Sequence, residues 1–156
     1  MLGRLKDVFR SFHEHDVRYV VIGGIASVAH GVPRATFDLD ILIEATPGNA
    51  QRLLDALLAA GLVTAQMTDA VTLLAKEITI FKDKVRIDVQ TKTPGIDFAS
   101  VWKRRVTMRH EGQEFHVLSK PDLIASKRTS GRPRGRSNAR ERRSIGRRLR
   151  RVKPTG

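Results

Sequence analysis

The sequence lacks cysteine and long apolar runs, and it contains only one tryptophan and one tyrosine. Without cysteine, disulfide bonds and thiolate metal sites are excluded. No window approaches the roughly 18 consecutive apolar residues of a membrane span, and the first residues lack the apolar core of a signal peptide. We therefore expect a soluble, cytoplasmic protein without a membrane partner.

Acidic residues are nearly absent from the last fifth of the chain. The 156 residues carry a formal net charge of +13. Residues 1–126 hold 16 Lys and Arg against 15 Asp and Glu, whereas residues 127–156 hold 13 Lys and Arg and a single acidic residue, Glu141. The basic excess therefore belongs to the C-terminal segment, and the body of the protein is close to neutral.

The apolar pattern predicts one domain followed by a tail. A chain of this length fits a single domain that buries its own core. After Gly131 only Ile145, Leu149 and Val152 are sizeable apolar residues, too few to bury much surface. We predict a folded domain over residues 1–131 and a disordered, arginine-rich tail over residues 132–156.

Apolar periodicity and turn residues predict an α/β or α+β domain with a small mixed sheet. A helix is expected from Pro47 to a cap at Gly61. The other expected helices are 2–14, 25–30, 97–103 and 121–130. The expected strands are 18–22, 37–43, 71–81, 84–91, 105–109 and 114–118, of which the last four form two hairpins.

The most informative stretch is residues 19–43, where a strand leads into Gly23-Gly24 and a second strand carries Asp38 and Asp40. Alternate residues of a strand point to the same side, so both carboxylates face one way. On a largely buried strand such like charges repel unless a cation neutralises them. A glycine turn lets a phosphate approach backbone N–H groups. The stretch predicts a nucleotide and Mg²⁺ site, the alternative being a strand end with solvated carboxylates.

Asp88 is the candidate for a third carboxylate. Two Mg²⁺ ions that position an attacking and a leaving oxygen on phosphorus generally need a third acidic ligand. Asp88 lies between apolar neighbours on the expected strand 84–91, and its carboxylate joins the other two if that strand pairs beside strand 37–43. The alternative is an edge-strand aspartate that faces water.

Four further residues are candidates for contacts with the nucleotide. Ser27 lies one turn after the glycines, Arg34 and Thr36 lie just before the aspartate pair, and Lys127 lies on the expected helix 121–130. Three of them also have a plain structural explanation. Ser27 suits a helix as a small residue, Arg34 suits a loop, and Lys127 suits the solvated side of a helix.

The pattern of Ile22-Gly23-Gly24, thirteen residues, Asp38-Leu39-Asp40-Ile41 and a later strand aspartate resembles the nucleotidyltransferase superfamily of the DNA polymerase β type. With VLSKPDLIASKRTSGRP downstream, the sequence is similar to small bacterial nucleotidyltransferase-like proteins. These include abortive-infection toxins and relatives of the minimal nucleotidyltransferases. The resemblance covers about residues 1–134.

This resemblance implies a mixed sheet with helices packed on one face. It also implies transfer of a nucleoside monophosphate from an NTP such as ATP to a hydroxyl group, with Mg²⁺ or Mn²⁺ as cofactor and pyrophosphate as product. Asp38, Asp40 and Asp88 would then be the catalytic metal ligands, Gly23 and Gly24 would cradle the phosphates, and Lys127 would contact the nucleotide. The acceptor would be a tRNA end, another RNA, a protein or a small molecule, in a toxin–antitoxin or phage-defence system with an antitoxin partner.

The sequence departs from the pattern of this superfamily at two places. Many members have serine where Gly24 stands, so one phosphate-binding hydroxyl is missing. Relatives continue after the Gly-Arg-Pro of residues 131–133 with an acidic helix, whereas an arginine run follows here. The run is either a tail that contacts nucleic acid non-specifically through phosphates or the product of a shifted reading frame. Two alternatives to an enzyme follow: a non-catalytic nucleotide- or RNA-binding relative, and a basic non-specific nucleic-acid-binding protein.

Overall fold

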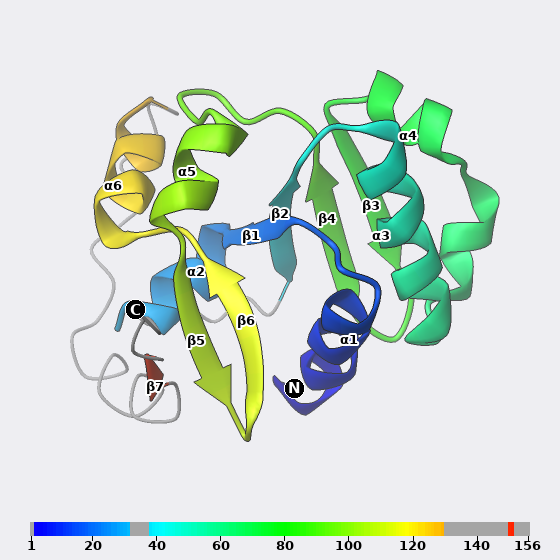
Figure 1. The fold of residues 1–156 in the computed structure, drawn as a ribbon, viewed down its shortest axis with the longest axis horizontal. Helices are drawn as coiled ribbons and strands as arrows, with labels where there is room; N and C mark the ends of the chain where they lie inside the picture. Colours follow the sequence, from blue (N-terminus) through cyan, green and yellow to red (C-terminus); the bar gives the residue numbers. More distant parts are fainter. Residues whose placement is uncertain (1, 32–37, 130–149, 152–156) are drawn as a thin grey trace.

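A computed structural model of the chain describes residues 2–31, 38–129 and 150–151 (Figure 1). Within them the fold is a mixed α+β domain, as expected. The α-helices are α1 (Leu2–Glu14), α2 (Gly23–Ala29), α3 (Pro47–Ala59), α4 (Ala70–Ala75), α5 (Phe98–Arg104) and α6 (Lys120–Thr129), with a 3₁₀ helix η1 (Val63–Met67). The strands are β1 (Tyr19–Ile22), β2 (Leu39–Ile43), β3 (Ile78–Lys82), β4 (Arg86–Gln90), β5 (Val106–His110), β6 (Gln113–Val117) and the two-residue β7 (Arg150–Arg151).

The strands form one mixed sheet in the order β3-β4-β2-β1-β6-β5-β7. β1 pairs antiparallel with β2, and both predicted hairpins are present as the antiparallel pairs β3–β4 and β5–β6. The pairs β2–β4 and β1–β6 are parallel. The parallel pairing of β2 with β4 decides where the candidate site lies, because it places two distant segments of the chain side by side.

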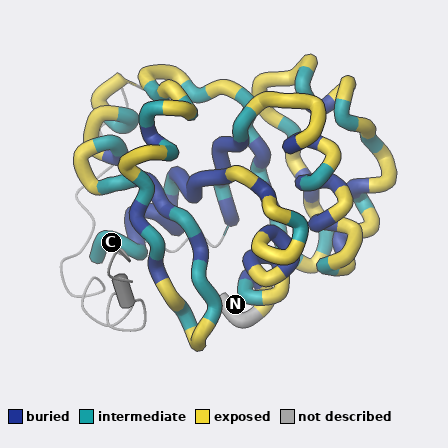
Figure 2. Tube along the Cα trace, in the orientation of Figure 1, coloured by how far each residue is buried: buried dark blue, intermediate teal, exposed yellow. Residues whose placement is uncertain are grey.

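The core is built around β1, whose four residues are all buried, and Figure 2 shows this buried stretch in the middle of the molecule. On one side α1 packs through aromatic rings, with Phe9 stacked on Phe115 at 4.6 Å and Phe12 against Tyr19 at 4.8 Å between ring centroids. Val20 points to the opposite side of the strand and is fully buried. Helices were expected on one face of the sheet, but at its centre both faces are covered.

The predicted helix that starts at Pro47 is present as α3. Thr46 precedes it as the N-cap, and its hydroxyl accepts a hydrogen bond from the backbone N–H of Asn49. At the other end the N–H of Gly61 donates to the carbonyl of Leu58 over 3.0 Å, and that of Leu62 to Leu57 over 2.9 Å. This pair of bonds is the Schellman arrangement, so Gly61 caps the helix as predicted.

The prediction of one long strand over residues 71–81 was wrong. Residues 70–75 form α4, and the strand begins only at Ile78. Asp69 caps α4, because its side chain accepts a hydrogen bond from the N–H of Thr72 over 2.7 Å. Leu73 is fully buried, whereas Val71 is 80% exposed. The β-branched residues suggested a strand, but the N-cap and one deep apolar anchor favour a helix.

The remaining predicted elements agree with the structure to within a few residues. The predicted disordered tail lies outside the described residues except at Arg150 and Arg151, which pair with β5 opposite Arg109 and Met108. None of the helices in the described part of the chain is long and apolar enough to span a membrane.

Candidate functional site

Asp40 on β2 and Asp88 on β4 lie directly opposite each other in the sheet. The two strands run parallel, and their register pairs Asp40 with Asp88. The preceding residues, Leu39 and Ile87, are fully buried, so the two carboxylates project from the opposite side of the sheet. The condition set for Asp88, that its strand lies beside the strand that holds Asp40, is therefore met.

Arg86 connects Asp88 with Asp38, the first aspartate of the predicted pair. Its Nε donates to Oδ1 of Asp88 over 3.0 Å, and its Nη2 donates to Oδ2 over 3.4 Å. The same Nε lies 3.8 Å from Oδ2 of Asp38. The Asp88 side chain is 17% exposed, against 46% for Asp38 and 40% for Arg86. One guanidinium group therefore links carboxylates from two strands, with the more buried one held through both oxygens.

The contacts of Arg86 also change its acid–base behaviour. The hydrogen bonds and the charge of Asp88 raise the pKa of Arg86, and the charges of Asp38 and Asp40 add to the effect. We did not single out Arg86 from the sequence. A signal was present, because Arg86 precedes Asp88 by two residues on the same strand and so shares its face.

Gly23 lies against the carboxylate of Asp40. Ile22, the last residue of β1, is paired with Asp40, and Gly23 follows with a φ of +70°. A Cβ atom added at Gly23 would collide with Oδ2 of Asp40. The glycine turn and the second aspartate of the predicted motif therefore touch, and glycine is required at this position both by the backbone and by the neighbouring carboxylate.

Two other residues of the predicted phosphate-binding segment are buried. Gly24 lies in the first turn of α2 and is buried. Ser27 has no exposed surface, and its hydroxyl donates to the carbonyl of Gly23 over 3.2 Å. The Ser27 hydroxyl therefore stabilises the glycine turn from inside the protein and does not point toward solvent.

The remaining predicted contacts lie elsewhere. Arg34 and Thr36 are outside the described residues. Lys127 lies in the last turn of α6 and is half-buried. Helix α6 packs against α2, the helix that begins at Gly23. Lys127 therefore lies on a helix that contacts α2, and not on the strands that carry the aspartates.

The three aspartates fit Mg²⁺ by the chemistry of their donors, because Mg²⁺ prefers carboxylate oxygens. Their positions in the structure, however, do not form a metal site. Within residues 2–31, 38–129 and 150–151, no three His, Asp or Glu side chains come together in a group that could hold a metal ion. Arg86 supplies positive charge beside Asp38 and Asp88. Joint metal binding would require these side chains to move closer together.

An apolar edge borders the carboxylates. Strand β3 pairs with β4 so that Ile80 lies opposite Asp88 and Ile78 opposite Gln90. Residues opposite each other in a sheet share a face, and here Ile80 is 52% exposed and Ile78 is 50% exposed. The edge strand β3 therefore presents exposed apolar side chains next to the carboxylates.

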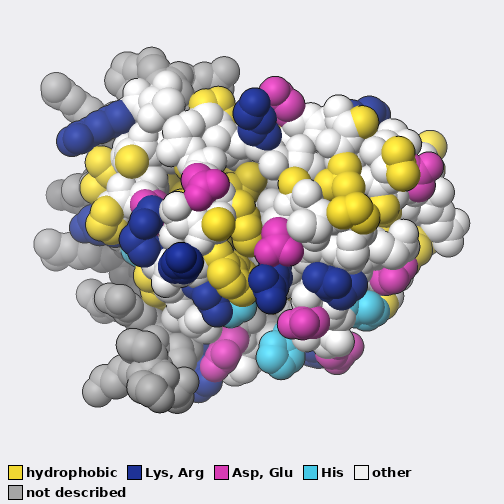
Figure 3. Space-filling model, turned by 45° about the horizontal axis from the view of Figure 1, so that its top comes forward, with side chains coloured by type: hydrophobic (Ala, Val, Ile, Leu, Met, Phe, Trp, Pro, Cys, Tyr) yellow, Lys and Arg dark blue, Asp and Glu magenta, His cyan; other side chains and the backbone are white. Residues whose placement is uncertain are grey.

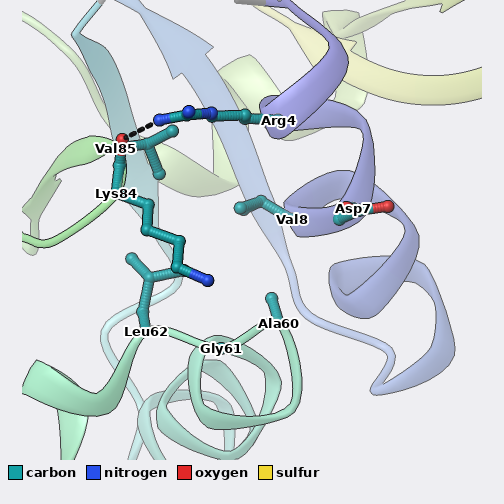
Figure 4. Close-up of a pocket in the computed structure, with 8 residues that line it drawn as sticks. All are labelled: Arg4, Asp7, Val8, Ala60, Gly61, Leu62, Lys84 and Val85. Carbon is teal, nitrogen blue, oxygen red and sulfur yellow. Dashed lines mark hydrogen bonds between the residues drawn. The ribbon is translucent and has the colours of Figure 1, made fainter.

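A separate pocket of about 330 Å³ lies between α1, the end of α3 and the turn before β4 (Figure 4). Its lining residues are Arg4, Asp7, Val8, Ala60, Gly61, Leu62, Lys84 and Val85. Within it Nη1 of Arg4 donates to the carbonyl of Lys84 over 3.1 Å. None of the predicted site residues lines this pocket. Since α1 and α3 cover the sheet face opposite to the carboxylates, we base the functional argument on the carboxylates and not on the pocket.

Comparison of the chain with protein-family models, curated proteins and solved structures finds no match.

Proposed function

We propose that this protein is a Mg²⁺-dependent nucleotidyltransferase that moves a nucleoside monophosphate from an NTP to a hydroxyl group. The observation that carries the proposal is the register of β2 and β4, which sets Asp40 opposite Asp88. The contact of Gly23 with Asp40 supports it, because it brings the glycine turn to the same place. Aspartates from two strands beside a glycine turn are what the resemblance to this superfamily requires.

In the proposed reaction, Asp38 and Asp40 would hold the metal together with Asp88. When bound, Mg²⁺ supplies charge neutralisation at the phosphoryl group that is transferred. Asp88 accepts the proton of the acceptor hydroxyl, whose oxygen bonds to the α-phosphorus. The bond from that phosphorus to the oxygen that bridges to the β-phosphate breaks, and pyrophosphate leaves with the bonding electron pair. The acceptor is an RNA end, a protein or a small molecule, and a toxin with an antitoxin partner is the context that we favour.

A non-catalytic nucleotide-binding relative of the same fold is the second candidate. The contact of Arg86 with both oxygens of Asp88 favours it, because those oxygens are the ones that a metal and an acceptor hydroxyl would use. On this alternative, NTP would bind without turnover.

Transfer from α-labelled ATP, CTP, GTP and UTP tests the proposal, with pyrophosphate release measured in the presence of Mg²⁺ and of RNA or protein acceptors. We expect the double variant D38N/D40N to lose more than about a hundredfold in rate, because both substitutions remove metal-binding charge. The variant D55N, on the exposed side of α3, is the matched control and should keep the activity. Pyrophosphate release that survives D38N/D40N would sink the catalytic assignment, and Mg²⁺-dependent NTP binding without turnover would favour the second candidate.

A further inference from the structure

Arg86 occupies the position of a cation among the three predicted metal ligands. Its guanidinium contacts both oxygens of Asp88 and lies 3.8 Å from Asp38. Asp40 is paired with Asp88 across the strands and contributes to the electrostatic environment of Arg86. Carboxylates that share one guanidinium repel each other in a protein without metal, and Arg86 offsets that repulsion at Asp38 and Asp88.

The contacts of Arg86 use the same oxygens as a metal would. A carboxylate that accepts two hydrogen bonds from a guanidinium fork presents its two oxygens to that fork. A divalent ion bound to Asp88 would place a second cation beside the guanidinium, and like charges at this distance repel. Metal binding at Asp88 therefore competes with the present position of Arg86.

Arg86 is also free enough to leave. Its side chain is 40% exposed and Asp38 is 46% exposed, so water can replace the bonds that the guanidinium gives up. The ion pair with Asp38, exposed to this extent, is weak, so the contact with Asp88, whose side chain is 17% exposed, is the one that a divalent ion has to displace. The residue stands at the start of β4, directly after the bend of residues 83–85, where a long side chain can turn toward solvent.

We propose that Arg86 is an exchangeable internal cation, which holds Asp38 and Asp88 in place in the metal-free protein and yields Asp88 to the divalent ion. This inference rests on the proposed function, because it assigns the same carboxylates to Mg²⁺. Arg86 acts here as a positioning residue. By occupying the oxygens of Asp88, it raises the concentration of divalent ion that is needed for binding. It also prevents other cations from binding these oxygens.

Calorimetric titration of the full chain with Mn²⁺ alone tests the exchange. Since an exposed pair of this kind competes only modestly, we expect R86Q to bind Mn²⁺ about fivefold more tightly than the wild type. The matched control is R109Q, which removes an equal charge. Arg109 forms an exposed ion pair with Glu114 (2.7 Å) on β5 and β6, near the other edge of the sheet. R109Q should leave the affinity unchanged. R86K keeps the charge without the fork, so its affinity should fall between those of wild type and R86Q.

Thermal unfolding supplies a second readout. In EDTA, R86Q should unfold at a lower temperature than the wild type, because the carboxylates lose their counter-charge. Excess Mg²⁺ should then stabilise R86Q more than it stabilises the wild type. R86K makes the same test if R86Q does not fold.

Three outcomes would overturn the inference. Equal or weaker Mn²⁺ binding by R86Q and R86K would remove the exchange and leave the proposed metal site standing. A gain in affinity that R109Q shares would reduce the effect to net charge. Absence of Mn²⁺ binding in every variant would remove the metal site, and with it both the inference and the metal-dependent function.

Discussion

Gly23 is the single residue whose replacement should damage the candidate site most directly. Its φ of +70° strains any residue with a side chain, and a Cβ there would meet Oδ2 of Asp40. We expect G23A to lower the free energy of unfolding by more than the about 1–2 kcal/mol that a left-handed alanine costs, because the Asp40 carboxylate must also move.

The matched control for G23A is G112A. Gly112 has a φ of +83°, but a Cβ at this position meets nothing within 4 Å. It should therefore lose only the backbone part of the cost. Denaturant unfolding of both variants measures the difference, and equal losses would show that the contact of Gly23 with Asp40 carries no energy.

His116 should make the stability of the protein depend on pH. Burial, and then the charge of Arg105, lower the pKa of His116 to about 4. The folded state therefore holds the imidazole neutral, while the unfolded chain takes up the proton at a pH near 6.5. Stability is fully present above pH 6.5 and is lost as the pH falls toward 4, by at most on the order of 3 kcal/mol. Urea unfolding at several pH values measures the slope.

The variant H116Q should remove this pH dependence between pH 6.5 and 4.5, since it deletes the titrating group. His15, whose ring contacts the Ser11 carbonyl, provides the control, and H15Q should keep the wild-type slope. An unchanged slope in H116Q would assign the effect to other groups.

The sequence was a good guide to the carboxylates and a poor guide to their partner. The alternation around Asp38 and Asp40 predicted that both face one way, and Asp88 was expected to join them if its strand paired alongside. The register of β2 with β4 sets Asp40 opposite Asp88. Arg86 was not predicted as a site residue, because a charged residue at the start of a strand is ordinarily solvated. Its contacts depend on the distance across to Asp38, which only the pairing of β2 with β4 determines.

At the scale of elements, the same contrast appears between α3 and α4. For α3, the Thr-Pro start and the glycine end are local signals, and local hydrogen bonds satisfy them. For α4, the Val-Thr-Leu-Leu run favours a strand by propensity, and the helix depends on the burial of Leu73 against α3 and its neighbours. Tertiary packing of that kind overrides propensity and cannot be read from the local sequence.

Asn49 ties α3 to the ends of β1 and β2. Its Oδ1 accepts from the N–H of Arg18 over 2.8 Å, and its Nδ2 donates to the carbonyls of Arg18 (3.0 Å) and Glu44 (2.9 Å). The side chain is fully buried. We expect N49A to reduce the free energy of unfolding by about 2–3 kcal/mol, because it leaves backbone groups without partners.

The variant Q51A, on the exposed side of the same helix, is the control for N49A. Gln51 makes one exposed hydrogen bond, to Asp55, so its loss should change stability by less than about 0.5 kcal/mol. Urea denaturation compares the two variants. A cost for N49A no larger than that for Q51A would mean that water replaces the bonds of Asn49.

At the scale of the whole molecule, the basic excess is concentrated in the C-terminal segment. On the face of the domain shown in Figure 3, basic and acidic side chains lie next to each other rather than forming one basic region. Residues 127–156 hold 13 of the 29 Lys and Arg residues and one of the 16 acidic residues. Any non-specific affinity for nucleic acid should therefore come from this segment.

The full chain should bind unrelated DNA and RNA with similar, strongly salt-dependent affinity. Each phosphate contact contributes about −0.9 to the slope of log affinity against log salt on duplex DNA. Replacing five arginines of the segment with glutamine should make the slope shallower by up to about 4 to 5; the five are Arg140, Arg142, Arg143, Arg147 and Arg148. Fluorescence anisotropy at several salt concentrations measures it. The same five changes to lysine should preserve the slope, and unchanged binding by the glutamine variant would contradict the assignment.

The central claim is that Asp38, Asp40 and Asp88 form one metal site that serves nucleotide transfer. The most direct test is a crystal structure of the full chain with Mn²⁺ and a non-hydrolysable NTP, in which anomalous scattering locates the metal. We predict Mn²⁺ bound by Asp38, Asp40 and Asp88, with the triphosphate beside it and Arg86 turned away from Asp88. Anomalous signal elsewhere in the protein, with Arg86 still bound to Asp88 and no metal between the strands, would contradict the account.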